Sequence, residues 1–226
     1  MIKIITQKFI DKTSRYLQEK QKQNIASRLD ERALDSTCEY IEREMSTIKP
    51  QKSVEAVMDV AFEHIQLSGL YLEFNVFSGK SINYIASKTP QTVHGFDSFE
   101  GLPEFWRDGF DKGAFEVDAL PKVHTNVMLH KGWFDNTLPQ FINDHPERIA
   151  LLHVDCDLYS STKTIFTLLG DRIIKGTVIV FDEYFNYPMW QQGEFKAFQE
   201  FIQERGLSYR YLTYNSNHEQ VAVIIE

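Results

Sequence analysis

The chain has 226 residues, of which 42% are hydrophobic and 25% are charged, and its formal net charge is −8. These values are ordinary for a globular protein and suit one substantial domain with additions. The excess of acidic over basic residues argues against the basic surface of a nucleic-acid-binding protein, so we expect no nucleic-acid partner.

The two cysteines and the beginning of the chain bear on the cellular compartment. Cys38 falls in a helical pattern and Cys156 in an apolar strand context, so both are predicted to be small buried side chains. Two such cysteines build neither a disulfide framework nor a cysteine-based zinc site. Residues 1–16 lack the apolar run of a signal peptide, and no segment is apolar enough to span a membrane. We therefore expect a reduced, cytoplasmic protein without a membrane partner.

Residues 1–50 predict a helical extension ahead of the main domain, which we place at 51–226. Its apolar residues Leu34, Cys38, Ile41 and Met45 recur at helical spacing among charged residues. A second helix follows, with Ser53 as its predicted N-cap and Gly69 beyond its end. Its apolar face consists of Val54, Val57, Met58, Ala61, Phe62 and Ile65.

From residue 70 onward, short apolar runs alternate with helical segments. Alternation of this kind predicts a parallel sheet covered by helices on both faces. Two final runs, separated by Asn215-Ser216-Asn217, predict an antiparallel hairpin. The sequence thus predicts an α/β fold with a seven-stranded sheet and one reversed strand. The runs cover residues 70–74, 92–96, 126–129, 149–154, 177–181, 207–214 and 220–225.

The first of these strands leads into a turn that partly matches a nucleotide-binding P-loop. Gly79-Lys80-Ser81 matches the last three residues of the P-loop motif, but Phe74 occupies the position at which a P-loop needs its other glycine. Asn75 tolerates left-handed backbone and can replace a turn glycine. The exposed amides at the start of the next helix favour a carboxylate or phosphate.

The ends of the second and third strands carry two further candidates. Asp97 is well placed to accept hydrogen bonds from the ribose of an adenosine ligand, or alternatively to cap its own turn. Gly132, Trp133 and Phe134 suit contact with a flat base, although an aromatic core corner has the same pattern. Residues 103–125 form a long aromatic connection, which we interpret as one wall of an acceptor pocket.

The ends of the fourth and fifth strands carry four carboxylates: Asp155, Asp157, Asp182 and Glu183. Such a group repels itself unless a cation or protons intervene, and oxygen ligands without thiolates suit Mg²⁺ or Ca²⁺. Alternatively, Asp157 and Glu183 are helix caps, and for Asp157 we favour the cap. His153 shares a face with Asp155, as a candidate base or as a satisfied core histidine.

Together these segments resemble the macrocin O-methyltransferase (TylF-type) family of class I S-adenosylmethionine-dependent methyltransferases. The resemblance runs from about residue 53 to the C-terminus and is carried by five motifs in order: LEFNVFSGKS, GFDSFEGLPE, KGWFDNTLP, LHVDCDLYSST and VIVFDEY. It implies a Rossmann-like sheet of strand order 3-2-1-4-5-7-6 with strand 7 antiparallel. It also implies an O-methyltransferase acting on a hydroxyl of a sugar or glycosylated small molecule.

The resemblance further implies roles for individual residues. Mg²⁺ would be held by Asp155, Asp182 and Glu183, with Asp155 as general base and His153 as a second catalytic candidate. The extension would serve as a lid or in homodimer formation. S-adenosylmethionine would contact Glu73, Asn75, Phe77, Ser78, Ser81, Asp97, Ser98, Gly132, Trp133, Phe134 and Asp155.

Two departures from the family pattern keep other functions open. Asn75 replaces the usual glycine, and Glu183 replaces an aspartate of the sugar methyltransferases. The alternatives are a metal-independent methyltransferase acting on another small molecule and a nucleotide-binding module without catalysis. An NAD-dependent oxidoreductase is disfavoured, because the chain lacks Gly-x-Gly-x-x-Gly and its terminal strand is predicted to be reversed.

Overall fold

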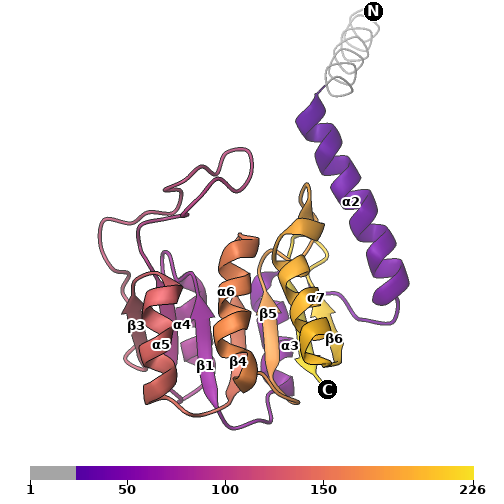
Figure 1. Cartoon of the computed structure of the whole chain (residues 1–226). Coiled ribbons are helices and arrows are strands. Elements are labelled where there is room, and N and C mark those ends of the chain that lie inside the picture. The colour runs from indigo at the N-terminus through magenta and orange to yellow at the C-terminus, as the bar shows by residue number, and fades with distance from the viewer. Residues whose placement is uncertain (1–23) are drawn as a thin grey trace, which may run out of the picture.

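The computed structural model describes residues 24–226, and the first 23 residues of the predicted extension lie outside this range. The described chain folds around one seven-stranded sheet of order β3-β2-β1-β4-β5-β7-β6 (Figure 1). β7 runs antiparallel to both β5 and β6, while the pairs from β3 to β5 are parallel. The predicted α/β class and strand order are therefore confirmed.

The strands agree with the predicted apolar runs to within two residues at each end. Their buried stretches contain many β-branched residues, as expected for strands covered on both faces. β4 illustrates this, because all six of its residues are buried. The strands are β1 (Leu70–Phe74), β2 (Val93–Asp97), β3 (Val127–Lys131), β4 (Ile149–Val154), β5 (Val178–Phe181), β6 (Tyr209–Tyr214) and β7 (Val221–Ile225).

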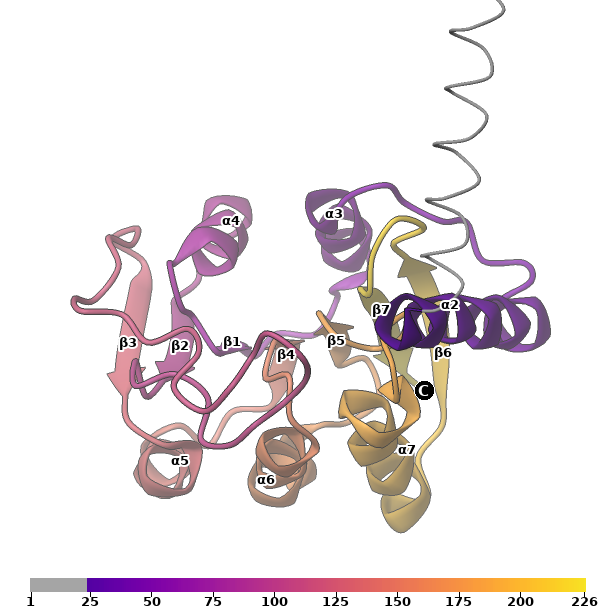
Figure 2. The same ribbon diagram turned by 90° about the horizontal axis from the view of Figure 1, so that it is seen from above.

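Helices cover both faces of the sheet (Figure 2). One face carries α3 (Val54–His64) and α4 (Lys80–Lys88). The other carries α5 (Phe134–Asp144), α6 (Tyr159–Leu169) and α7 (Glu194–Arg205), and the short 3₁₀ helices η1 (Gly170–Arg172) and η2 (Trp190–Gln192) precede β5 and α7. Each helical layer encloses its own apolar core against the sheet. This arrangement leaves the edge at the carboxyl ends of the parallel strands to the loops, where α/β proteins bind ligands.

The second predicted helix is confirmed as α3, with the expected cap. The Ser53 hydroxyl accepts a hydrogen bond from the Ala56 amide at 3.2 Å, which satisfies one of the free amides of the first turn. Val57, Met58 and Ala61 are buried against the sheet.

Helix α2 (Ile25–Glu44) confirms a helix before residue 50, and of the predicted apolar residues Met45 is buried and Ile41 packs partly buried against the core. Its buried residues are Ala33, Thr37 and Tyr40, whereas Leu34 is 52% exposed and Cys38 is also exposed. The prediction that Cys38 is buried is therefore wrong, while Cys156 is buried as predicted.

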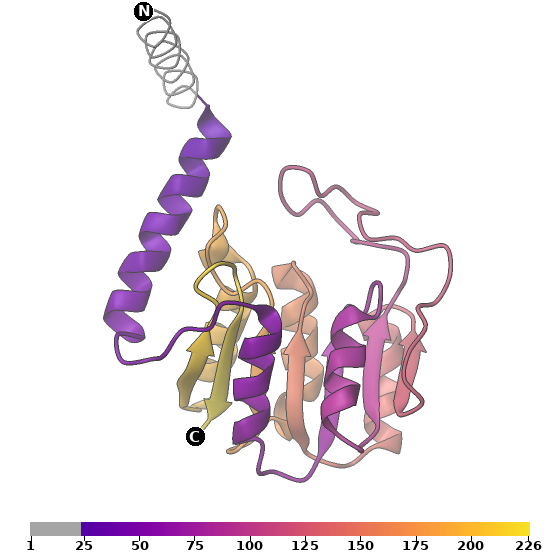
Figure 3. The ribbon, with the colours of Figure 1, turned by 180° about the vertical axis from the view of Figure 1, so that it is seen from behind.

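The physical reason is that α2 stands at one side of the protein (Figure 3) and is covered along the strip formed by Ala33, Thr37 and Tyr40. The Tyr40 ring packs edge-on against Trp190 and Phe195, each at 5.4 Å between ring centroids. The Thr37 hydroxyl accepts a hydrogen bond from the Asn186 amide at 3.0 Å. Apolar periodicity therefore predicted the helix, but tertiary contacts decided which side of it is covered. Across residues 24–226, no helix combines the length and apolarity needed to cross a bilayer.

A cluster of histidines lies between the sheet and α5. The His94 and His130 rings stack, with Nδ1 of His94 3.1 Å from Nε2 of His130, and the His145 ring lies 4.9 Å from that of His94. Burial, followed by repulsion from the other two rings, lowers the pKa of His94 to about 4, and Glu147 partly opposes this. The pKa of His130 is lowered for the same reasons, by burial and by His145.

This cluster predicts a specific pH dependence of folding. In the unfolded chain His94 binds a proton below about pH 6.5, whereas in the folded protein it does so only below about pH 4. The contribution of His94 to the free energy of unfolding is therefore complete above pH 6.5 and is lost as pH falls. As pH falls from 7 to 5, we expect the free energy of unfolding of the wild type to fall by about 2 kcal/mol relative to that of His94→Phe. Urea titrations at both pH values measure this difference, with exposed His124→Phe as control. Parallel changes in His94→Phe and wild type would contradict the prediction.

Candidate active site

The turn after β1 has the backbone that the sequence predicted. Asn75 has φ 72°, in the left-handed region that asparagine tolerates better than most residues, so it does replace a turn glycine. Its amide donates to the Phe96 carbonyl at 2.9 Å, which joins the turn to β2. Phe77 and Gly79 also have positive φ values, and α4 begins directly afterwards. Three left-handed residues in five positions bring the start of α4 back over the sheet edge.

Asp97, at the end of β2, holds this turn in place. Its Oδ2 accepts a hydrogen bond from the Phe77 amide at 2.7 Å, and its Oδ1 accepts one from the Phe99 amide at 2.6 Å. Burial raises the pKa of Asp97, while the two amides act in the opposite direction by stabilising the carboxylate. The next residue, Ser98, accepts a hydrogen bond from the Glu100 amide. The turn-capping alternative is therefore present in the structure, and the ribose contact stays a prediction.

The segment after β3 lies beside Asp97. The Gly132 amide donates to the Asp97 carbonyl at 2.9 Å, and Gly132 has φ 144°. Trp133 is partly buried and immediately precedes α5. The Phe134 ring packs edge-on against Phe74, at 5.1 Å. Phe134 thus contributes to the core corner, and the contact of this segment with adenine stays a prediction.

Two buried side chains from adjacent strands form a pair beneath the turn. The carboxylate of Glu73 is fully buried and lies 3.0 Å through Oε2 from Nδ1 of His153. Its other oxygen accepts a hydrogen bond from the Ser81 hydroxyl at 3.0 Å. Burial raises the pKa of Glu73, whereas the Glu73 carboxylate raises the pKa of His153 against the opposing effect of burial. Nε2 of His153 is buried and has no hydrogen-bond partner in the described chain.

His153 also belongs to a compact group of possible metal ligands. One ligand atom each from His153, Asp155 and Asp182 lies within 4.8 Å of the others. Burial raises the pKa of Asp155 well above its ordinary value, and repulsion from Asp182 and Asp157 adds to the effect. Oδ2 of Asp182 accepts a hydrogen bond from the Gln220 side chain at 3.0 Å. The structure thus brings together two of the three predicted metal ligands and adds the histidine.

Glu183, the third predicted ligand, is not one of this group of three. Its carboxyl is buried, and its Oε2 has no hydrogen-bond partner within residues 24–226. Burial raises the pKa of Glu183 well above its ordinary value, with repulsion from Asp157 and Asp182 next. No sequence motif pointed to Glu194, yet its buried carboxylate accepts hydrogen bonds from the amides of Cys156 (2.9 Å) and Glu183 (3.3 Å). Glu194 thereby fixes both acidic strand ends relative to each other.

Asp157 does not cap a helix. Helix α6 has Leu158 as its N-cap without a side-chain hydrogen bond, so the cap that we favoured is wrong. Asp157 instead has φ 63° and is 3% exposed, and its Oδ2 has no hydrogen-bond partner among the described residues. Burial raises the pKa of Asp157 to about 8, even though the positive charge of Arg107 opposes this.

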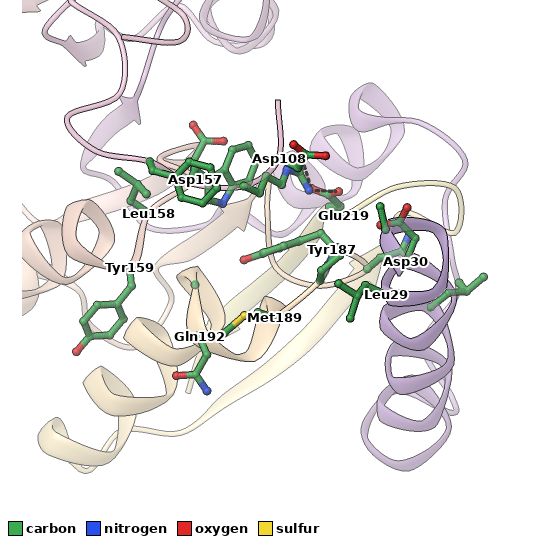
Figure 4. A pocket seen from close by; sticks show the side chains of 18 of the residues that line it. Leu29, Asp30, Asp108, Asp157, Leu158, Tyr159, Tyr187, Met189, Gln192 and Glu219 are labelled. Carbon is green, nitrogen blue, oxygen red and sulfur yellow. Dashed lines mark hydrogen bonds and ion pairs between the residues drawn. The ribbon is translucent and has the colours of Figure 1, made fainter. Parts of the chain in front are cut away.

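Asp157 lines a cavity of about 1260 Å³ next to the acidic group (Figure 4). Its walls come from α2, from residues 104–108 of the long connection, from the start of α6, from residues 186–193 and from the β6–β7 hairpin. The connection is ordered by stacked aromatic rings, among them Phe110 on Phe115 at 5.3 Å. It therefore contributes one wall of a cavity, as expected, and α2 contributes another.

Arg107 anchors the connection across this cavity. Its guanidinium donates to both Glu219 oxygens, at 3.0 and 3.4 Å, and lies 3.8 Å from the centroid of the Trp106 ring. The ring of Tyr187 also lies 5.1 Å from this guanidinium, and its buried hydroxyl has no hydrogen-bond partner in the described chain. Sequence reasoning missed Arg107, Glu219 and Tyr187. These residues come from three distant segments, and only Glu219, in the hairpin, lies next to a predicted strand.

Comparison with known proteins finds a family match over part of the chain. Residues 114–211 match the family described as macrocin O-methyltransferase (TylF). The chain is 28% identical over 117 residues to demethyldecarbamoylnovobiocin O-methyltransferase of Streptomyces niveus, covering 43% of this chain and 44% of that protein. It is 30% identical over 116 residues to 8-demethyl-8-(2,3-dimethoxy-alpha-L-rhamnosyl)-tetracenomycin-C 4′-O-methyltransferase of Streptomyces olivaceus, covering 42% and 43%. The chain thus matches under half the length of these relatives.

The fold has a close counterpart among solved structures. The calicheamicin methyltransferase CalS11 aligns with a TM-score of 0.62 and 23% sequence identity, over 75% of this chain and 77% of that one. This agreement extends the class I methyltransferase fold over most of the described chain. The family match includes the fourth and fifth strand ends with their acidic group. Over residues 114–211, the chain is therefore similar to the macrocin O-methyltransferase (TylF) family.

Proposed function

We propose that the protein is an S-adenosylmethionine-dependent O-methyltransferase that methylates a hydroxyl of a sugar or glycosylated small molecule with the help of a divalent metal. The observation that carries the proposal is the group of His153, Asp155 and Asp182, within 4.8 Å of one another at the carboxyl edge of the sheet. This group lies next to a cavity large enough for a glycoside. The named activities of the relatives, O-methylation in both cases, support it.

The residues present fit a divalent cation. Two carboxylates supply hard oxygen ligands, and a cation would relieve the repulsion that raises the pKa of Asp155. The pairing of His153 with Glu73 through Nδ1 leaves Nε2 without a partner among the described residues, and a carboxylate commonly orients metal-binding histidines in this way. We assign the site to His153, Asp155 and Asp182, with Glu183 as a further candidate. A bound Mg²⁺ or similar ion would lower the pKa of the acceptor hydroxyl and orient it.

The acceptor hydroxyl must lose its proton as it attacks the methyl group, because an alcohol is a weak nucleophile at neutral pH. Asp157 is the carboxylate of the acidic group that lines the cavity, and its Oδ2 has no partner in the described chain. We therefore assign proton removal to Asp157. Asp155, the base implied by resemblance, is assigned to the metal instead.

We assign the cofactor to the same carboxyl edge of the sheet, at the part opposite the metal ligands and Asp157. The turn of Asn75 to Gly79 and the carboxylate of Asp97 border that edge, beside the segment from Gly132 to Phe134. Exposed amides at the start of α4 favour the carboxylate of the methionyl group. We propose that S-adenosylmethionine lies across these turns, with its sulfonium toward Asp155. The homodimer and the cytoplasmic location stay predictions.

Calorimetric titration of S-adenosylhomocysteine, in Mg²⁺ and again in EDTA, tests the proposal directly. We expect micromolar binding in both buffers, because the proposed cofactor contacts do not include the metal. Turnover with glycosides is then expected only in Mg²⁺. A metal-independent methyltransferase would turn over equally in EDTA, and a non-catalytic module would bind the product without turnover. No binding in either buffer would refute a methyltransferase function.

A further inference from the structure

The cavity beside the acidic group has walls that are unusually rich in carboxylates. These carboxylates come from α2, the long connection, the segment before α6 and the hairpin, so four separate parts of the chain contribute negative charge to the cavity, as Asp30, Asp108, Asp157 and Glu219 illustrate in Figure 4. The lining carboxylates are Asp30, Glu31, Glu104, Asp108, Asp157 and Glu219.

Positive charge is scarce in these walls. Within residues 24–226, Arg107 is the one lysine or arginine that lines the cavity. Its guanidinium is already engaged by both oxygens of Glu219 and stacked on Trp106. A phosphate or carboxylate on the acceptor would therefore face several carboxylates without a free cation among the described lining residues to receive it.

Two buried polar atoms indicate independently that this cavity receives a ligand. Asp157 and Tyr187 are 3% and 5% exposed, and Oδ2 of the first and the hydroxyl of the second have no hydrogen-bond partner in the described chain. Both residues line the cavity, and the Tyr187 hydroxyl lies so close to Gly193 that a Cβ there would be 2.1 Å away. Polar atoms left unpaired in this way are costly, and a ligand would satisfy them.

The cavity also exposes large apolar side chains. Leu29 and Leu34 on α2 are 43% and 52% exposed, and Phe105 and Met189 on the facing loops are 61% and 73% exposed. Exposed apolar side chains gathered around one cavity are typical of ligand-binding surfaces. They favour an acceptor with a substantial apolar body.

We propose that the acceptor is a cationic glycoside, in which an apolar body lies against α2 and a protonated amine lies against the carboxylates of Asp30, Glu104 and Asp108. This inference rests on the proposed function, which assigns the cavity to the acceptor. It places methylation after the reaction that joins the sugar to its apolar body. A nucleoside diphosphate sugar would bring its phosphates into the same acidic walls, so it is disfavoured.

Three probes of one shape and different charge test the proposal: the 4-nitrophenyl glycosides of glucosamine, glucose and glucuronic acid. Each is titrated by ligand-observed NMR into the full chain loaded with S-adenosylhomocysteine and Mg²⁺. We expect the glucosaminide to bind about tenfold more tightly than the glucoside, the glucuronide to bind most weakly, and high salt to reduce the differences.

A double variant, Asp30→Asn with Asp108→Asn, is expected to lose most of the preference for the amine and to keep its affinity for S-adenosylhomocysteine. Both residues are exposed, so folding should tolerate the changes. Glu63→Gln, an exposed change on α3 outside the cavity, is the matched control and should keep the preference. If the cofactor product binds but the glucosaminide binds no better than the glucoside, or not at all, the cationic acceptor is refuted. A failure of the cofactor product to bind would refute the proposed function instead.

Discussion

Asp182→Asn is expected to lower methyl transfer by about a thousandfold or more, because it removes a negatively charged ligand from the group formed with His153 and Asp155. Its affinity for S-adenosylhomocysteine should stay within about threefold of wild type, since the proposed cofactor contacts lie on other turns. The asparagine side chain can still accept the hydrogen bond that Gln220 donates, so the local structure should persist.

Thermal unfolding gives a second readout of the same variant that does not depend on activity. Mg²⁺ should raise the melting temperature of the wild type, because an ion that binds only the folded protein stabilises it. In Asp182→Asn this shift should disappear. In EDTA the variant should melt at a higher temperature than the wild type, since one source of repulsion on Asp155 is gone. Asp144→Asn, an exposed change of the same type on α5, should behave as wild type in both buffers. Full activity of Asp182→Asn, or an unchanged Mg²⁺ shift, would contradict the metal assignment.

Asp157→Asn is expected to lower kcat by about a hundredfold to ten-thousandfold, the usual contribution of a general base. The substitution keeps the shape of the side chain and removes its ability to take the acceptor proton. Single-turnover methylation with saturating S-adenosylmethionine measures the step directly. Because Asp157 is not one of the three residues in the proposed metal group, the Mg²⁺-induced melting shift should be retained.

Asp155→Asn provides the comparison that separates the two acids. If Asp155 holds the metal and Asp157 removes the proton, both variants lose activity, but only Asp155→Asn also loses the Mg²⁺-induced shift. The opposite pattern would return the base role to Asp155, as the family resemblance implied. Turnover of Asp157→Asn within tenfold of wild type would exclude Asp157 as the base.

The fold followed from local patterns that a single sequence carries well. Buried strands such as Ile149–Val154 are short apolar runs, and a helix such as Val54–His64 has an N-cap serine and a 3.6-residue period. The carboxyl ends of parallel strands meet at one edge, so Glu73, Asp97, Asp155 and Asp182 could be assigned to a common site without coordinates. Asn75 could be assigned a left-handed turn, because few residues adopt that backbone at low cost.

The tertiary structure decided the contacts between segments that are distant in the chain. His153 was ambiguous until the register of β1 and β4 placed it opposite Glu73, which leaves Nε2 free. Asp157 was assigned to a helix cap on local grounds and instead lines the cavity, because α6 begins one residue later than a cap would need.

The cavity itself depends on α2, Arg107, Tyr187 and Glu219, whose positions come from loop conformation and from packing along a single strip of α2. The sequence by itself determined the strands and the residues at their carboxyl edge, because these depend on periodicity and on the geometry of parallel strands, while the strand order was implied by the resemblance to a known family. Only the tertiary structure decided which acids share a site, which one faces the cavity and which charges surround it, because those are properties of side-chain contacts that no local pattern encodes.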